Sequence, residues 1–173
     1  MEVAERTCVF LMLNPSTADE DKLDPTVTRC VAHAKRWHFD AMTVLNLFAW
    51  RATDPADMKA AEEPIGKLND AIIREVTSKA AMTVLAFGNH AAHLDRYQFV
   101  GCLPQDRLFF FQKNKTGHPK HPLYVSKQAD LYRWQDGSIV TIDEIRQKGR
   151  LDGAAGNAVQ SRHDIGVKHG IST

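Results

Sequence analysis

The sequence predicts an α/β protein in which a four-stranded, mainly parallel sheet lies between two layers of helices, a three-layer α/β/α arrangement. Four short apolar runs alternate with segments of helical periodicity, a pattern typical of parallel strands joined by crossover helices. The first run, residues 8–13, is almost continuously apolar, as expected for a strand that is buried on both faces. The 173 residues are enough for one domain with a sizeable core.

The expected elements follow one another in a regular order. Strands are predicted at residues 8–13, 42–48, 81–87 and 107–112. Asp24 before Pro25, and Asp54 before Pro55, are each typical of a helix start with an aspartate N-cap. The first of these helices is expected to reach Trp37 and the second to be short, and two further helical patterns cover residues 68–79 and 89–97. Because right-handed crossovers keep the strands parallel, their carboxyl ends are expected along one edge.

The character of the chain changes near residue 135, which predicts a core domain of residues 1–134 and a C-terminal extension of residues 135–173. Residues 139–145 are compatible with a small strand and helix that Thr141 caps. Residues 151–173 contain much Gly and Ala and few large apolar residues, so this part is expected to be a loosely packed tail or a small element that contacts DNA.

The composition excludes several classes of protein. The net charge of +1 gives no overall nucleic-acid signature, and no apolar run approaches the roughly 20 residues of a membrane span. The acidic N-terminus is unlike a signal peptide. Three widely spaced cysteines argue against a disulfide framework, a zinc ribbon or an iron–sulfur cluster, and fit a reducing compartment. We therefore expect a cytoplasmic monomer without metal or cofactor.

Polar residues follow the predicted strands where the strands end. Asn14, Pro15 and Ser16 come after the first strand, and Asn46 lies near the end of the second. Ligands of open α/β sheets bind outside the carboxyl ends of strands, so Asn14 and Asn46 are candidates for orienting a water or reading a ligand edge. The alternatives are that Asn14 only hydrogen-bonds the loop at Pro15 and that Asn46 only joins neighbouring loops.

A loop at residues 117–124 holds two histidines, two prolines and a glycine. Proline stiffens the loop, and a held neutral imidazole can donate to an oxygen that gains negative charge. Residues 107–127 contain five Lys or Arg and no acid, which suits a phosphate backbone unless this is only a rigid, solvated surface. His90 and His93 favour a helix-surface pair over a metal site. One of Asp19, Asp21 and Asp24 is a candidate general base.

Four motifs carry a resemblance to known proteins. Leu-Asn-Pro-Ser-Thr-Ala at residues 13–18, Val-Leu-Asn-Leu-Phe at 44–48, Asp-Pro-Ala-Asp at 54–57 and Gly-His-Pro-x-His-Pro-Leu-Tyr at 117–124 resemble a bacterial and phage domain family of unknown function. That family is similar, more distantly, to the uracil-DNA glycosylase superfamily, with the closest motif likeness to the mismatch-specific uracil/thymine glycosylases. Asn14-Pro15 resembles their Asn-Pro-Gly, with Ser16 in place of the glycine.

The resemblance implies a glycosylase-like fold and a role for each matching residue. Asn14 and a nearby carboxylate, Asp19, would present water, and His118 or His121 would stabilise charge on the base, since the loop spacing departs by one residue. The residues implied at the base are Asn46, Phe48, Pro15 and Ser16. The residues expected at the DNA backbone are Lys113, Lys115, Lys120, Ser126 and Lys127. No metal or cofactor is implied.

Three functions follow as hypotheses. The first is a DNA glycosylase-like enzyme that flips out an altered base and cleaves its glycosidic bond. The second is a phage-type transferase that builds hypermodified bases on the same fold. The third is a non-catalytic nucleic-acid or nucleotide binding module. A small-molecule nucleoside hydrolase also stays open, because the weak net charge does not require DNA.

Overall fold

Strand β1 (Thr7–Met12) lies at the centre of the fold, in a computed structural model that describes residues 6–17, 24–151 and 166–169. It pairs in parallel with β2 (Ala41–Asn46) on one side and with β3 (Met82–Leu85) on the other. The full sheet has the order β6-β5-β4-β3-β1-β2-β7. The remaining strands are β4 (Leu108–Phe110), β5 (Leu131–Arg133), β6 (Ile139–Val140) and β7 (Gly166–His169).

The α/β class is confirmed, but the predicted four-stranded sheet is too small. The four predicted strands correspond to β1–β4, and β7 adds a fifth parallel strand beside β2. Strands β5 and β6 run antiparallel, so the sheet is mixed. The small strand predicted within residues 139–145 corresponds to β6. Strands β5 and β7 have three and four residues, too few to produce a recognisable alternation in the sequence. The specific glycosylase-like sheet is therefore not confirmed.

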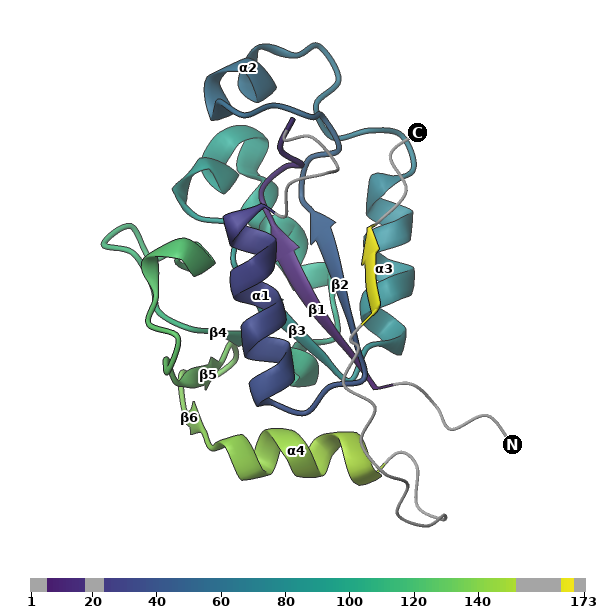
Figure 1. Ribbon diagram of the computed structural model, residues 1–173. Coiled ribbons are helices and arrows are strands. Elements are labelled where there is room, and N and C mark those ends of the chain that lie inside the picture. Colours follow the sequence, from purple (N-terminus) through teal and green to yellow (C-terminus); the bar gives the residue numbers. More distant parts are fainter. Residues whose placement is uncertain (1–5, 18–23, 152–165, 170–173) are drawn as a thin grey trace.

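Helices cover both faces of the sheet, as Figure 1 shows for α1 and α3. The described α-helices are α1 (Pro25–Arg36), α2 (Pro55–Ala60), α3 (Asn69–Lys79) and α4 (Ile142–Leu151). Both predicted Asp-Pro starts are confirmed, because Asp24 caps α1 and Asp54 caps α2. In Figure 1, α2 lies beyond the arrowheads of β1 and β2, at the carboxyl edge of the sheet.

Two apolar clusters, one on each side of the sheet, explain the layers. Successive side chains of β1 point to opposite faces, so Val9 packs in the cluster that includes Ile73 of α3. Phe10 packs in the other cluster, which includes Cys30 and Trp37 from α1 and its C-cap. The predicted three-layer arrangement is thus confirmed, and β1 is buried on both faces as its sequence indicates.

The helix predicted at residues 89–97 is a 3₁₀ helix, and it is longer than predicted. The segment forms 3₁₀ turns, η1 (Asn89–Cys102), and a kink at residues 93–95 divides them. Leu94 and Asp95 have positive φ angles of 52° and 51°. The kink turns Arg96 into the interior, where it is buried, and the periodicity of apolar residues gives no sign of such a break. Two shorter 3₁₀ turns follow at η2 (Gln105–Arg107) and η3 (Pro122–Tyr124).

The C-terminal extension contributes to the same sheet. β5 pairs with β6, so the sheet continues across the predicted boundary at residue 134. Thr141 caps α4 as predicted, because its Oγ1 accepts from Glu144 N at 3.2 Å while the Glu144 carboxylate accepts from Thr141 N at 2.8 Å. The rest of the predicted tail, residues 152–165 and 170–173, lies outside the described residues. Among the described helices, none is long and apolar enough to cross a membrane.

Candidate functional site

The carboxyl ends of β1 and β2 lie side by side, which brings two of the predicted polar groups to one edge. Met12 is paired with Asn46 in the sheet register. The ladder continues past both strands, because Leu47 N donates to Met12 O and Phe48 N donates to Leu13 O, each at 2.9 Å. The loop that begins at Asn14 therefore starts beside Asn46, as expected for neighbouring parallel strands.

Asn14 ties its own loop to the segment that follows β2. Its Nδ2 donates to Pro15 O at 3.1 Å and to Ala52 O at 2.8 Å, and Ala52 N donates to Pro15 O at 3.0 Å. Both amide hydrogens are thus used by main-chain carbonyls, which agrees with the alternative that Asn14 supports its loop. No described residue donates to Oδ1, so this oxygen is the part of Asn14 that can face a ligand.

Ser16 and Asp24 join this loop to the start of α1. Ser16 Oγ donates to Asp24 Oδ2 at 3.1 Å, and Thr26 N donates to Asp24 Oδ1 at 2.7 Å. Each carboxylate oxygen therefore has one donor, and the carboxylate is held in a single orientation with lone pairs to spare. The predicted general base Asp19 lies outside the described residues, and Asp24 is the carboxylate placed beside Ser16.

The two histidines of the proline-rich loop have different environments. His121 caps η3, where its Nδ1 accepts from Leu123 N at 3.4 Å, so the neutral ring carries its proton on Nε2. Burial lowers the pKa of His121, and the charge of Asp24 opposes this shift. His118 instead packs its ring edge-on against Tyr97, with 5.1 Å between the ring centroids. His121 is therefore the histidine that lies within the electrostatic reach of Asp24.

Main-chain hydrogen bonds hold the histidine loop at both ends, as its prolines lead one to expect. Gly88 N, at the turn after β3, donates to Pro119 O at 2.9 Å. Lys120 N donates to Gln112 O at 2.8 Å, which closes the loop on itself. Beyond η3, Arg29 of α1 donates from Nη1 to Val125 O at 3.2 Å. The loop thus connects the end of β3 with α1.

Asn46 presents its side chain without a partner. It is half-buried, and within the described part of the chain no residue hydrogen-bonds its side-chain amide. Its main-chain oxygen accepts from Asn69 Nδ2 at 3.0 Å. The alternative for Asn46 was that its side chain only joins neighbouring loops. In the structure its main-chain oxygen makes such a link, and the amide group stays available for a ligand.

Phe48, which the resemblance implies at the base, lies in the core of the fold. Phe48 is fully buried in the cluster on the α3 side, with the ring of His93 at 5.8 Å. Nothing in the local sequence separates such a core ring from a binding ring. Tyr124, next to His121 at 5.9 Å between ring centroids, is 71% exposed, and Trp50 is 49% exposed. These two rings are placed better for stacking than Phe48 is.

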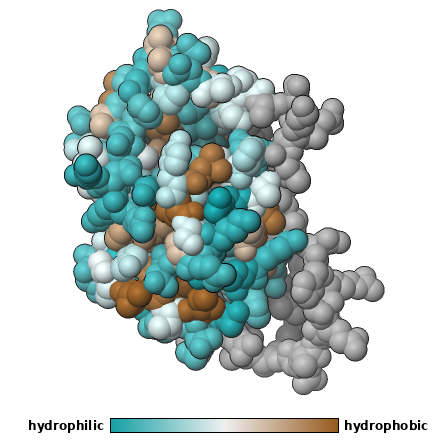
Figure 2. All heavy atoms as spheres, turned by 60° about the vertical axis from the view of Figure 1, so that its left-hand side comes forward, coloured by the Kyte–Doolittle hydropathy of each residue, from teal (hydrophilic) through white to brown (hydrophobic). Residues whose placement is uncertain are grey.

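The residues predicted to contact a DNA backbone are spread along the histidine loop. Lys115, Ser126 and Lys127 are exposed, whereas Lys120 is half-buried and donates to Gln112 Oε1 at 3.5 Å. Lys113 is exposed but has its Nζ over the rings of Phe110 and Trp134, at 5.1 and 4.8 Å from the centroids. Figure 2 shows the side of the molecule that carries β5 and β6, where hydrophilic residues surround separate apolar patches.

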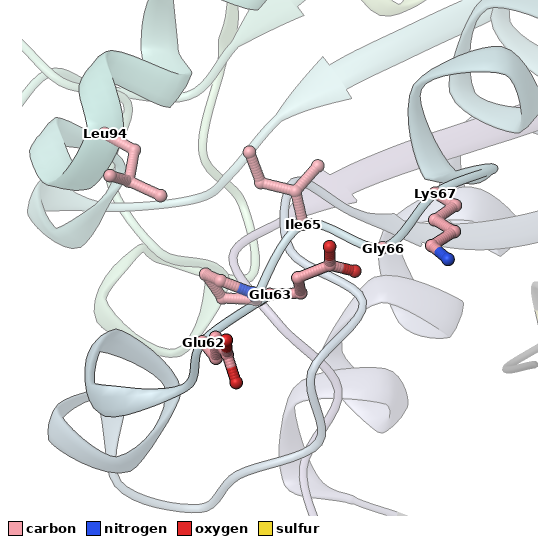
Figure 3. Close-up of a pocket in the computed structure, with 7 residues that line it drawn as sticks. Glu62, Glu63, Ile65, Gly66, Lys67 and Leu94 are labelled. Carbon is pink, nitrogen blue, oxygen red and sulfur yellow. The ribbon is translucent and has the colours of Figure 1, made fainter.

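A surface hollow of about 300 Å³ lies between the segment that precedes α3 and the kink of η1. Figure 3 shows Leu94 on η1 across from Ile65, with Glu62 and Glu63 on the same segment as Ile65. None of the predicted site residues lines it. In the described residues, no group of three or more His, Cys, Asp or Glu is arranged to hold a metal ion.

Comparison with protein families gives one match. A family model described as "Protein of unknown function (DUF1643)" matches residues 2–123, a range that includes β1–β4 and the histidine loop as far as Leu123. No curated protein and no solved structure matches the chain.

Proposed function

The chain belongs to the DUF1643 family of proteins of unknown function, and we propose that it is a DNA N-glycosylase-like enzyme acting on a uracil-like or modified pyrimidine base. One observation carries the proposal: Asp24 accepts from Ser16 and its charge acts on the His121 imidazole, at the carboxyl edge where no described residue hydrogen-bonds the Asn46 amide. We name these four residues the edge cluster. The motif resemblance to uracil-DNA glycosylases supports the same choice.

The edge cluster has the parts that a flipped base requires. Enzymes that act on a base extrude it from the stack, hydrogen-bond its Watson–Crick edge and stack a ring on its face. The Asn46 amide offers two donors and one acceptor for the edge. Tyr124 offers an exposed ring beside His121. The exposed lysines on either side of the histidine loop, Lys115 and Lys127, would lie along the backbone phosphates.

In the proposed reaction, water replaces the base at the sugar carbon. The bond between the sugar carbon and the base nitrogen breaks, and its electron pair leaves with the base. Asp24, held by Ser16 and Thr26, stabilises the cationic sugar and accepts the proton of the attacking water, while Asn14 Oδ1 accepts a hydrogen bond that orients this water. The departing base then takes a proton from solvent.

His121 would stabilise the departing base as a neutral donor. Burial lowers its pKa, so the ring is neutral near pH 7 even with Asp24 nearby. Because Nδ1 accepts from Leu123 N, the ring donates from Nε2. A neutral donor stabilises a base oxygen as negative charge grows on it. His118, which packs on Tyr97, has no part in this proposal.

A second candidate, the non-catalytic nucleic-acid or nucleotide binding module, is favoured by Asn14. Its amide hydrogens both bind main-chain carbonyls, so the residue has a structural task that needs no reaction. The base-modifying transferase has no observation of its own and becomes an outcome of the test. The cytoplasmic location and the monomeric state stay predictions.

Product analysis of D24N tests the proposal, with D54N as the matched control. Asparagine is as good an N-cap as aspartate, so D24N keeps the start of α1, while it removes the charge and replaces the oxygen that accepts from Ser16 with an NH2 group. Asp54 caps α2 with the same geometry but does not belong to the edge cluster. Wild-type protein and both variants are incubated with oligonucleotides that carry uracil or modified pyrimidines, and the products are identified by mass spectrometry.

We expect wild type and D54N to release free base and leave abasic sites at equal rates, and D24N to be about 100-fold slower or more. Equal rates for D24N and wild type would remove Asp24 from the mechanism. A mass increase on a base whose glycosidic bond stays intact would identify the transferase instead. Salt-dependent binding without any product would identify the binding module.

A further inference from the structure

The end of β2 is held by side chains from two other elements. Asn69, at the start of α3, donates from Nδ2 to Asn46 O at 3.0 Å and to Leu47 O at 3.1 Å. Arg96 of η1 donates to Leu47 O from Nε at 3.1 Å and from Nη2 at 2.8 Å. Two consecutive carbonyls at the strand end thus accept four hydrogen bonds from side chains.

Arg96 is itself fixed in place. Its Nη2 donates to Asp70 Oδ1 at 2.6 Å and its Nη1 to Asp70 Oδ2 at 3.3 Å. The guanidinium lies over the ring of Phe99, 4.6 Å from its centroid, and Arg96 is only 6% exposed. A buried charge is tolerated when it is paired and fully hydrogen-bonded, and the planar guanidinium presents its donors at fixed angles. Arg96 therefore links α3, η1 and β2 rigidly.

The backbone before Arg96 adopts a conformation that L-residues avoid. Leu94 and Asp95 have φ angles of 52° and 51°, in the left-handed region, without being glycine. Such residues persist only where the surrounding contacts determine them, and they occur often at functional sites. Here the kink directs the guanidinium to Leu47 O.

We propose that Asn69 and Arg96 are positioning residues, which hold the end of β2 so that the Asn46 side chain faces the base. This inference rests on the proposed function. No described residue hydrogen-bonds the Asn46 amide, so the main chain that Asn69 holds is the hydrogen-bonded part of this residue from which the side chain takes its direction. A reading group that is oriented before binding loses less entropy when the base arrives.

The test combines N69A and R96K with Q105A as the matched control. Gln105 Nε2 also donates to two carbonyls, Val100 O at 2.8 Å and Leu103 O at 2.9 Å, but these lie near η2 and away from β2. Lysine in place of Arg96 keeps the charge beside Asp70 and loses the fork to Leu47 O. If R96K does not fold, N69A decides alone.

Two properties are measured in each variant: the NMR order parameter of the Asn46 side-chain amide, and the ratio of base-release rates from uracil- and thymine-containing oligonucleotides. The Asn46 signals are assigned by their loss in N46D. In N69A and R96K we expect a lower order parameter for the Asn46 amide and a melting temperature within a few degrees of wild type. The ratio of uracil to thymine release is expected to lie about 10-fold closer to one than in wild type. In Q105A we expect both properties to match wild type.

An unchanged Asn46 order parameter in N69A would overturn the positioning role. An equal loss of order in Q105A would overturn it as well, since the effect would then reflect general loosening. The order parameter needs no substrate, so it separates this inference from the proposed function. If wild type releases no base from any oligonucleotide, the proposed reaction fails, while an Asn46 amide that loosens only in N69A and R96K still supports the positioning role.

Discussion

Two helices of this protein begin with the same dipeptide, Asp-Pro, and their aspartates have different surroundings. Asp24 of α1 and Asp54 of α2 each accept from the backbone N–H two residues on, at 2.7 and 2.8 Å. The second oxygen of Asp24 also accepts from Ser16, whereas no described residue donates to the second oxygen of Asp54. The same Asp-Pro dipeptide thus starts a helix in both places. In α2 it does only that, whereas in α1 its aspartate is also part of the candidate site.

The histidines near the two caps extend the comparison. Burial lowers the pKa of His121, and Asp24 is the one charged group that opposes it. Burial also lowers the pKa of His90, where the cation of Lys59 adds to the decrease and Asp54 raises the pKa by less. The electrostatic difference is therefore that the cation of Lys59 acts on His90 together with Asp54, whereas Asp24 is the charge among the described residues that acts on His121.

The largest expected effect is the loss of stability in acid that is caused by His33, a buried histidine of α1 with no counterpart in α2. The ring is 1% exposed between Trp37 and Phe111, and no described residue hydrogen-bonds either ring nitrogen. Burial lowers its pKa from 6.5 to about 4, helped by the charges of Arg36 and Arg29. Because the unfolded chain binds the proton first, the stabilising contribution is complete above pH 6.5 and is lost as the pH falls to 4. Between pH 6.5 and pH 4, His33 is expected to lower the free energy of unfolding by about 3 kcal/mol in total.

Urea unfolding between pH 7 and pH 4 measures this loss. H33L should remove most of the slope between pH 6.5 and 4, and H90N, a change to an exposed histidine near α2, should leave it nearly intact. A wild-type slope in H33L would show that another group controls acid unfolding.

A smaller effect separates the two caps directly. Alanine at an N-cap position costs about 0.5–2 kcal/mol. D24A also leaves the Ser16 hydroxyl without its charged acceptor, so we expect a loss of about 2 kcal/mol in the free energy of unfolding. D54A, at an exposed cap of a six-residue helix, should lose about 1 kcal/mol or less. Equal losses in urea titrations would mean that the second oxygen of Asp24 adds no stability.

The smallest effect isolates that second oxygen. S16A removes the hydrogen bond to Asp24 Oδ2 and keeps the cap of α1, so we expect a loss of about 1 kcal/mol. S126A is the control, because Ser126 is exposed and its hydroxyl only accepts from Gln128 N. Its stability should stay within about 0.5 kcal/mol of wild type. A loss in S16A no larger than in S126A would show that the Ser16–Asp24 bond is marginal in solution.

Much of the fold follows from local patterns. Both Asp-Pro caps, the four central strands and the Thr141 cap of α4 were predictable, since each depends on residues that are neighbours in sequence. The predictions were incomplete where the local signal was weak: β5 and β7 are short and were not predicted, and η1 is a 3₁₀ helix with a kink that its sequence does not indicate. Three-residue strands form because a neighbouring strand offers free hydrogen-bonding groups, and that neighbour is distant in sequence.

The candidate site was predictable as a location more than as a set of roles. The strand ends at Asn14 and Asn46 meet because parallel strands share a carboxyl edge. The sequence left His118 and His121 equivalent, and it placed Phe48 at the ligand although the ring is fully buried. Asn69 and Arg96 gave no signal at all, because their partners are main-chain carbonyls of a distant strand.

The sequence by itself determined that an α/β sheet forms with Asp24 and Asp54 as caps, because a cap needs only the backbone N–H groups of the next few residues. Only the tertiary structure decided that Asp24 holds Ser16 and reaches His121 while Asp54 does not. The second oxygen of each carboxylate accepts a hydrogen bond only if the packing of other segments places a donor beside it. For Asp24 this packing supplies Ser16 from the loop after β1 and places His121 where the charge of Asp24 acts on it, and both depend on how the whole sheet is assembled.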